Sequence, residues 1–171
     1  RPSQMDEVAR DRFSLTFNGP FEAGVRAVAV LGSAFPRSYD IQRLTAFDYL
    51  LVRTHQLGGP DDLHPATPIQ TPATQVSRRV VQDALHLMMT RDLVVRVINE
   101  HGISYRAGET AAMFLESLRT PYLTALKDRA DWLVYYLADY TDTELDSLMR
   151  RFFDTWVVEF QNVERSLGAS E

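Results

Sequence analysis

Few side chains in this sequence have the type and spacing that catalysis or metal binding requires. The 171 residues contain no cysteine, which excludes disulfides, zinc ribbons, iron–sulfur ligation and thiol catalysis. The four histidines lie far apart, and only His64 is close to carboxylates, those of Asp61 and Asp62. In a proline-rich stretch such aspartates usually accept hydrogen bonds from their own backbone. We therefore expect turn chemistry there, with a cation site or a small enzyme as the weaker alternative.

The sequence also lacks the known catalytic and phosphate-binding motifs. None of its eight glycines belongs to a GxxxxGK[ST] or GxGxxG loop, whose backbone N–H groups would close on a phosphate. The stretch LGSAF at residues 31–35 lacks the second glycine of a serine nucleophile elbow. We expect a protein that is not an enzyme, with no catalytic, cofactor-binding or metal-binding residues.

Arginine supplies nearly all of the positive charge, because Lys127 is the one lysine among 18 basic residues. Guanidinium groups pair bidentately with carboxylates and phosphates, although GC-rich codon usage explains the bias equally well. Five arginines fall on a predicted third helix and hairpin and are our candidates for contacting DNA: Arg78, Arg79, Arg91, Arg96 and Arg106. Three acids on the same elements reduce their charge to +2. The alternative is that Arg91 and Arg96 pair with neighbouring acids and that the fold docks proteins.

Apolar and aromatic side chains form a second set of candidates, because a chain this small cannot easily cover two wide apolar stripes. They come from a long proline-rich segment and from helix faces that lie off the main apolar rows. The candidate partner-docking residues are Leu63, His64, Ile69, Trp132, Tyr136 and Phe153.

The elements that must position these residues are mainly helical, with one small β-hairpin. Pro20 should open a first helix that Pro36 ends, and Asp40 should cap a second helix that is buried on more than one side. Four prolines forbid regular structure from Gly58 to Thr74. Strands are predicted over residues 12–18, 93–98 and 103–106, and further helices over residues 75–90, 109–118, 121–139 and 142–164.

Three helices followed by a β-hairpin is the order of a winged helix. We expect a winged-helix-like domain over residues 12–108, with a long Pro-rich loop at 58–74. A C-terminal helical extension over 109–171 should pack on it as an antiparallel helical hairpin. The cap at Thr120-Pro121 and the capping box from Thr141 to Glu144 should start its last two helices.

The charge and hydropathy of the chain limit its surroundings. The net charge is −5, and residues 109–171 hold six bases against twelve acids, so a phosphate-facing surface should lie earlier in the chain. No apolar run of 18 residues occurs, so we expect no membrane span. The first residues contain no apolar signal core, which favours a cytoplasmic setting.

A series of short motifs over about residues 15–137 resembles the middle component of bacterial ABC-three-component systems, which include the Lamassu-type antiphage defences. The earlier motifs are FNGPFEAGVR at 17–26, DIQRL at 40–44 with FDYLLV at 47–52, and LGGP at 57–60 with LHP at 63–65. The later ones are LMM at 87–89, GISYRA at 102–107, and PY at 121–122 with Leu126, Arg129, Ala130, Asp131 and Trp132.

The resemblance implies a small non-catalytic subunit whose partners are an SMC- or Rad50-like ABC ATPase and an effector, commonly a nuclease. Such a subunit docks on the ATPase and helps couple DNA sensing to the effector. The family assigns no base-reading or catalytic residues, so none is transferred to this chain. The alternative from the residues alone is an autonomous winged-helix regulator that binds duplex DNA.

Overall fold

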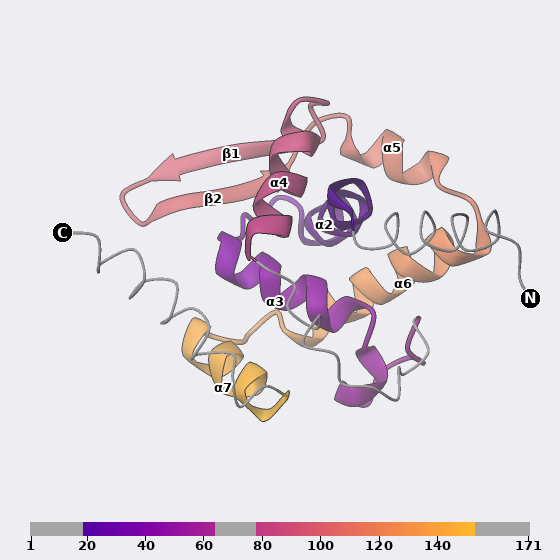
Figure 1. The fold of residues 1–171 in the computed structure, drawn as a ribbon, viewed down its shortest axis with the longest axis vertical. Coiled ribbons are helices and arrows are strands. Elements are labelled where there is room, and N and C mark those ends of the chain that lie inside the picture. The colour runs from indigo at the N-terminus through magenta and orange to yellow at the C-terminus, as the bar shows by residue number, and fades with distance from the viewer. Residues whose placement is uncertain (1–18, 64–77, 153–171) are drawn as a thin grey trace, which may run out of the picture. The chain divides into compact units, whose positions relative to one another are not determined.

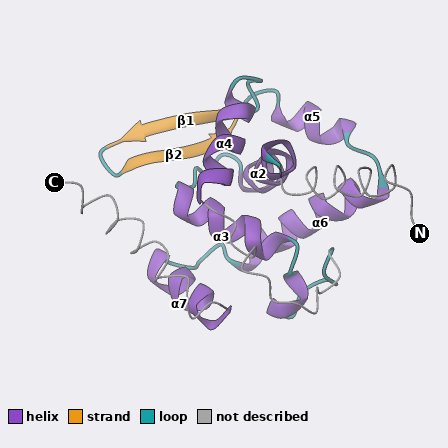
Figure 2. Ribbon diagram, in the orientation of Figure 1, coloured by secondary structure: helices purple, strands orange, loops and turns teal. Residues whose placement is uncertain are grey.

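The computed structural model describes residues 19–63 and 78–152, and its fold is mainly α-helical with one two-stranded antiparallel sheet, as predicted (Figures 1 and 2). The predicted strand at 12–18, most of the Pro-rich loop and the end of the last predicted helix lie outside the described residues. The elements are α2 (Pro20–Ala34), α3 (Ile41–Leu51), the 3-10 helix η1 (Thr54–Leu57), α4 (Arg78–Met89), β1 (Val94–Asn99), β2 (Gly102–Ala107), α5 (Ala111–Ser117), α6 (Pro121–Tyr136) and α7 (Asp142–Phe152).

The chain divides into two compact units, one ending at Tyr136 and one beginning at Leu137. Helices α5 and α6 therefore belong to the same unit as the earlier elements, and α7 belongs to the second. The domain boundary expected after residue 108 and the packing of the last two predicted helices on each other stay predictions.

Helix α2 is the central element of the first unit (Figure 1). It begins with Pro20 at its first turn, as predicted, and packs against α3, α4, α5, α6 and β2. Val28 and Leu31 are fully buried, and burial of one such side chain stabilises a fold by about 1.5–3 kcal/mol. Two glycines admit close neighbours on this helix, since Gly24 lies against Met88 of α4 and Gly32 against Leu115 of α5.

Helix α3 is capped by Asp40, as the sequence predicts, because its carboxylate accepts a hydrogen bond of 2.7 Å from the backbone N–H of Arg43. Every residue from Leu44 to Val52 is buried, which confirms that this helix is covered on more than one side. The chain then turns through η1, and Gly58 ends that turn with a left-handed φ of 79°.

Strands β1 and β2 form the predicted hairpin, with Val94 opposite Ala107 and Ile98 opposite Ile103. The turn uses Gly102 at a φ of 112°, and the side chain of Asn99 accepts a hydrogen bond from the backbone N–H of His101. The segment that connects α2 to α3 also pairs with this hairpin. The backbone of Tyr39 exchanges two hydrogen bonds, of 2.9 and 2.8 Å, with that of Tyr105 in β2.

The predicted starts of α6 and α7 are confirmed by their caps. The hydroxyl of Thr120 accepts a hydrogen bond from the backbone N–H of Leu123, and Thr141 accepts one from that of Glu144, both at 3.2 Å. The Thr141 hydroxyl also donates to the carboxylate of Glu144, so both capping-box side chains are engaged. Helix α6 ends at Tyr136, three residues before its predicted end.

Candidate functional site

The five candidate DNA-contacting arginines do not form one continuous face. Arg78 and Arg79 are exposed in the first turn of α4, whereas Arg91 is exposed just beyond the other end of this helix. A helix of 12 residues is about 18 Å long at a rise of about 1.5 Å per residue. These two groups of arginines therefore lie at opposite ends of α4.

The two arginines of the hairpin are also separated. Arg96 pairs with Tyr105 and Arg106 with Val95, so neighbouring register positions place the two guanidinium groups on opposite faces of the sheet. Arg96 is exposed and Arg106 is half-buried. Neither Arg91 nor Arg96 forms an ion pair with a described residue, so the pairing with neighbouring acids considered as the alternative is not seen.

The start of the Pro-rich loop is attached to α6. The guanidinium group of Arg129 donates two hydrogen bonds, of 3.0 and 2.8 Å, to the backbone carbonyl of Asp61. One turn along, the indole of Trp132 lies against Gly59 so closely that an added Cβ would be 2.6 Å from two of its ring carbons. The indole also stacks on the ring of Tyr136, with the centroids 4.9 Å apart.

Local hydrogen bonds within residues 54–62 fold the segment that α6 contacts. The buried hydroxyl of Thr54 donates to the carbonyl of Pro60 at 2.7 Å, and the carboxylate of Asp62 accepts from the backbone N–H of His55 at 3.0 Å. This Asp62 bond joins residues seven apart, so the turn chemistry predicted for the aspartates stays a prediction. Within residues 19–63 and 78–152, no group of three or more His, Asp or Glu side chains is placed to hold a metal ion.

The candidate docking residues have different surroundings. Trp132 is half-buried against Gly59, and Tyr136 is 38% exposed. Leu63 is half-buried and donates its backbone N–H to Val52. His64, Ile69 and Phe153 lie outside the described residues. Their docking role stays a prediction.

A buried ion pair joins α2 to α3, which sequence reasoning did not anticipate. Arg26 donates to Asp48 through Nε at 2.7 Å and through an Nη at 3.4 Å, with the two side chains only 10% and 6% exposed. Burial lowers the pKa of Arg26, but the adjacent carboxylate outweighs this and leaves that pKa raised. Arg26 and Asp48 are 22 residues apart, a spacing that gives no helical or strand period from which the pair could be predicted.

Partial burial raises the pKa of Tyr122, at the start of α6, because burial disfavours the charged phenolate.

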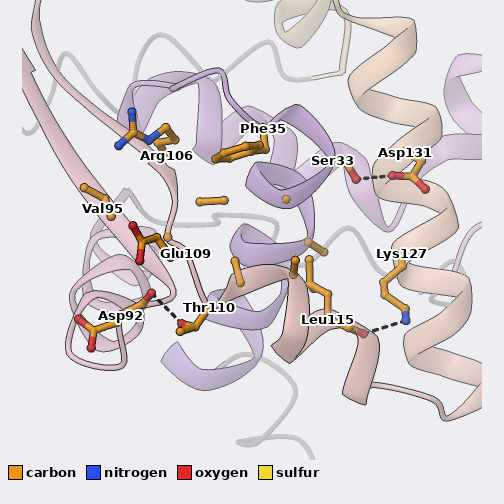
Figure 3. A pocket seen from close by; sticks show the side chains of 16 residues that line it. Ser33, Phe35, Asp92, Val95, Arg106, Glu109, Thr110, Leu115, Lys127 and Asp131 are labelled. Atoms are coloured by element: carbon orange, nitrogen blue, oxygen red, sulfur yellow. Dashed lines mark hydrogen bonds between the residues drawn. The ribbon is translucent and has the colours of Figure 1, made fainter.

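A cavity of about 990 Å³ opens between the end of α2, the base of the hairpin, α5 and α6 (Figure 3). Much of its lining is alanine and glycine, and the exposed ring of Phe35 stands at its edge beside Arg106 (Figure 3). The hydroxyl of Ser33 donates to Asp131 at 2.5 Å, and Nζ of Lys127 donates to the carbonyl of Leu115 at 2.9 Å. Of the predicted site residues, only Arg106 lines this cavity.

The helices of the described part of the chain are too short or too polar to cross a membrane. Residues 16–159 match the model of the family described as ABC-three component (ABC-3C) system Middle Component 2. Neither the curated proteins nor the solved structures include a match to this chain.

Proposed function

Because the chain belongs to the family of ABC-three-component system middle components, we propose that it is the bridging subunit of such a system. In this role it docks on an SMC- or Rad50-like ABC ATPase and helps couple the sensing of DNA to a nuclease-type effector. The system is an antiphage defence of the Lamassu type, and this subunit performs no catalysis itself. The family match over residues 16–159 is the observation that carries the proposal.

The surface of the first unit supports a role in assembly. Large apolar side chains are exposed on several of its elements, including Phe35 at 60%, Ile98 at 69% and Ile103 at 50%. Apolar surface of this kind marks protein interfaces when it gathers into patches, and a bridging subunit needs more than one. Tyr135, which is 86% exposed, adds an aromatic ring next to Tyr136 on α6.

Reconstitution of the complex tests this proposal. The chain is co-expressed with the ATPase and effector encoded beside it, purified through a tag on the ATPase, and weighed by native mass spectrometry. The proposal expects the chain in stoichiometric amounts in a complex with both subunits. Recovery of the ATPase and effector without this chain contradicts it.

A second function, that of a free-standing DNA-binding regulator, is favoured by the order of the elements. Three helices and a hairpin, with the Tyr39 segment between the first two helices pairing with β2, are typical of a winged helix. Helix α4 would then be the recognition helix, and Arg78 and Arg79 are exposed in its first turn.

Electrophoretic mobility shifts of duplex DNA at increasing salt test this second function. It expects the isolated chain to shift DNA at moderate salt, and expects replacement of both Arg78 and Arg79 by Ala to abolish the shift. Arg119→Ala, an exposed arginine before α6, is the matched control. Absence of any salt-sensitive affinity in the wild-type chain excludes this function.

A further inference from the structure

The cavity beside α5 has the features of a protein-docking groove, which we call the α5 groove. Its volume of about 990 Å³ is at the upper end of the range of ligand pockets, about 300–1,000 Å³. Ala29, Ala111 and Ala112 line it with small side chains, which leaves room for bulky ones from another molecule. Two of its larger apolar side chains are accessible, since Phe35 is 60% and Val95 39% exposed.

The charged groups of the α5 groove are divided between its two sides. On the α6 side, Lys127 donates a hydrogen bond to the carbonyl of Leu115, and Asp131 accepts one from the hydroxyl of Ser33. On the hairpin side, Asp92, Glu109 and Arg106 line the groove, and their side chains make no hydrogen bond or ion pair with a described residue (Figure 3). Two carboxylates against one guanidinium leave this side with an excess of negative charge.

We propose that the α5 groove binds an amphipathic helix of a partner subunit, which inserts bulky apolar side chains and presents a basic residue to Asp92 and Glu109. This inference rests on the proposed function, since it names the surface through which the bridging subunit holds one partner. A helix fits because apolar side chains three and four residues apart share one face and can enter the groove together. The flanking basic residue finds two carboxylates that form no ion pair with a described residue.

The net charge of the chain disfavours a second copy as the occupant. Each copy carries a net charge of −5, so two copies repel one another. The groove side chains that form no ion pair with the described part of the chain are also mainly acidic. A small metabolite also fits less well, because it would leave Phe35 and Val95 exposed at the rim.

Substitutions on and beside the α5 groove provide the test. Ala112→Trp places a large ring in the groove from an exposed position on α5, so it should not disturb the core. Its matched control is Met113→Trp, since the neighbouring side chain is exposed and does not line the groove. Glu109→Arg reverses a groove charge, and Glu116→Arg makes the same reversal at an exposed position outside the groove.

Binding is measured by isothermal titration of each variant with the purified ATPase and, separately, with the purified effector of the same system. Circular dichroism confirms that every variant is folded. We expect Ala112→Trp to weaken binding to one of the two subunits at least tenfold, and Glu109→Arg to weaken it severalfold at low salt and less at high salt. Met113→Trp and Glu116→Arg should bind within twofold of the wild type.

Three outcomes overturn the inference. If Ala112→Trp binds both subunits as Met113→Trp does, the groove is not the docking site, although the bridging function stands. If the wild-type chain is a dimer by light scattering and Ala112→Trp makes it a monomer, the occupant is a second copy. If the wild-type chain binds neither subunit, the proposed function fails together with the groove.

Discussion

Substitution of Gly59 by alanine tests whether the contact with Trp132 holds the start of the Pro-rich loop on α6. The added methyl group would lie 2.6 Å from two carbons of the indole and 2.8 Å from a third. The ring cannot retreat freely, because it is also stacked on the ring of Tyr136. Overpacking of this kind costs about 1–3 kcal/mol.

An opposing effect sets the net magnitude. Gly59 does not have a left-handed φ, so alanine is unstrained there and stabilises by about 0.4–1 kcal/mol through the unfolded chain. We therefore expect Gly59→Ala to destabilise the protein by about 1–2 kcal/mol. At about 2–4 °C per kcal/mol for a chain of this size, Tm should fall by about 2–8 °C.

A double-mutant cycle with Trp132→Ala isolates the contact. Without the indole the methyl group has space, so Gly59→Ala should become neutral or stabilising, and the two substitutions should couple by at least about 1 kcal/mol. Urea unfolding followed by circular dichroism measures all four proteins. Gly58→Ala is the control, because Gly58 has a left-handed φ and no neighbour within 4 Å, so its cost should not depend on Trp132. Additivity of Gly59→Ala and Trp132→Ala within about 0.3 kcal/mol would refute the contact.

Two further predictions concern the interior of the first unit. Asp48→Ala should destabilise the protein by about 3–5 kcal/mol in urea unfolding, because it leaves the guanidinium group of Arg26 buried without its carboxylate. The double substitution of Arg26→Met with Asp48→Leu removes both charges and should be nearly neutral. Equal losses of stability in the two proteins would contradict this prediction. Burial raises the pKa of Tyr49 and Tyr122 above the usual value of about 10, so phenolate absorbance should appear at higher pH in the folded than in the denatured protein. Because a raised pKa favours the neutral phenol, the stability that these two tyrosines contribute is complete below about pH 10 and is lost as the pH rises through their pKa values in the folded protein. Tyr122→Phe should reduce that loss of stability.

Local chemistry explains what could be predicted from the sequence. Asp40, Thr120 and Thr141 each cap a helix within three residues of their own position, so their role is readable without the rest of the fold. The hairpin is equally local, because β-forming runs flank a turn that contains Gly102.

The functional surfaces depend on long-range packing, which the sequence pattern does not contain. Trp132 and Gly59 are far apart in the chain, and nothing in their spacing indicates that the indole covers the glycine. Trp132 was expected at a partner interface because it lies off the main apolar row of its helix. The α5 groove similarly combines residues of α2, β1, β2, α5 and α6, and of the predicted site residues only Arg106 belongs to it. Phe35 follows the spacing of the apolar row of α2 in the sequence, so nothing there distinguishes its exposed side chain, just beyond the helix end, from core residues.

The composition of the complex purified through the ATPase is the most direct test of the bridging role. Native mass spectrometry of the three co-expressed proteins should give one assembly that contains this chain, the ATPase and the effector, and omission of this chain should separate the effector from the ATPase. If the ATPase and effector remain together without this chain, or if this chain is recovered alone as a monomer, it is not the bridging subunit.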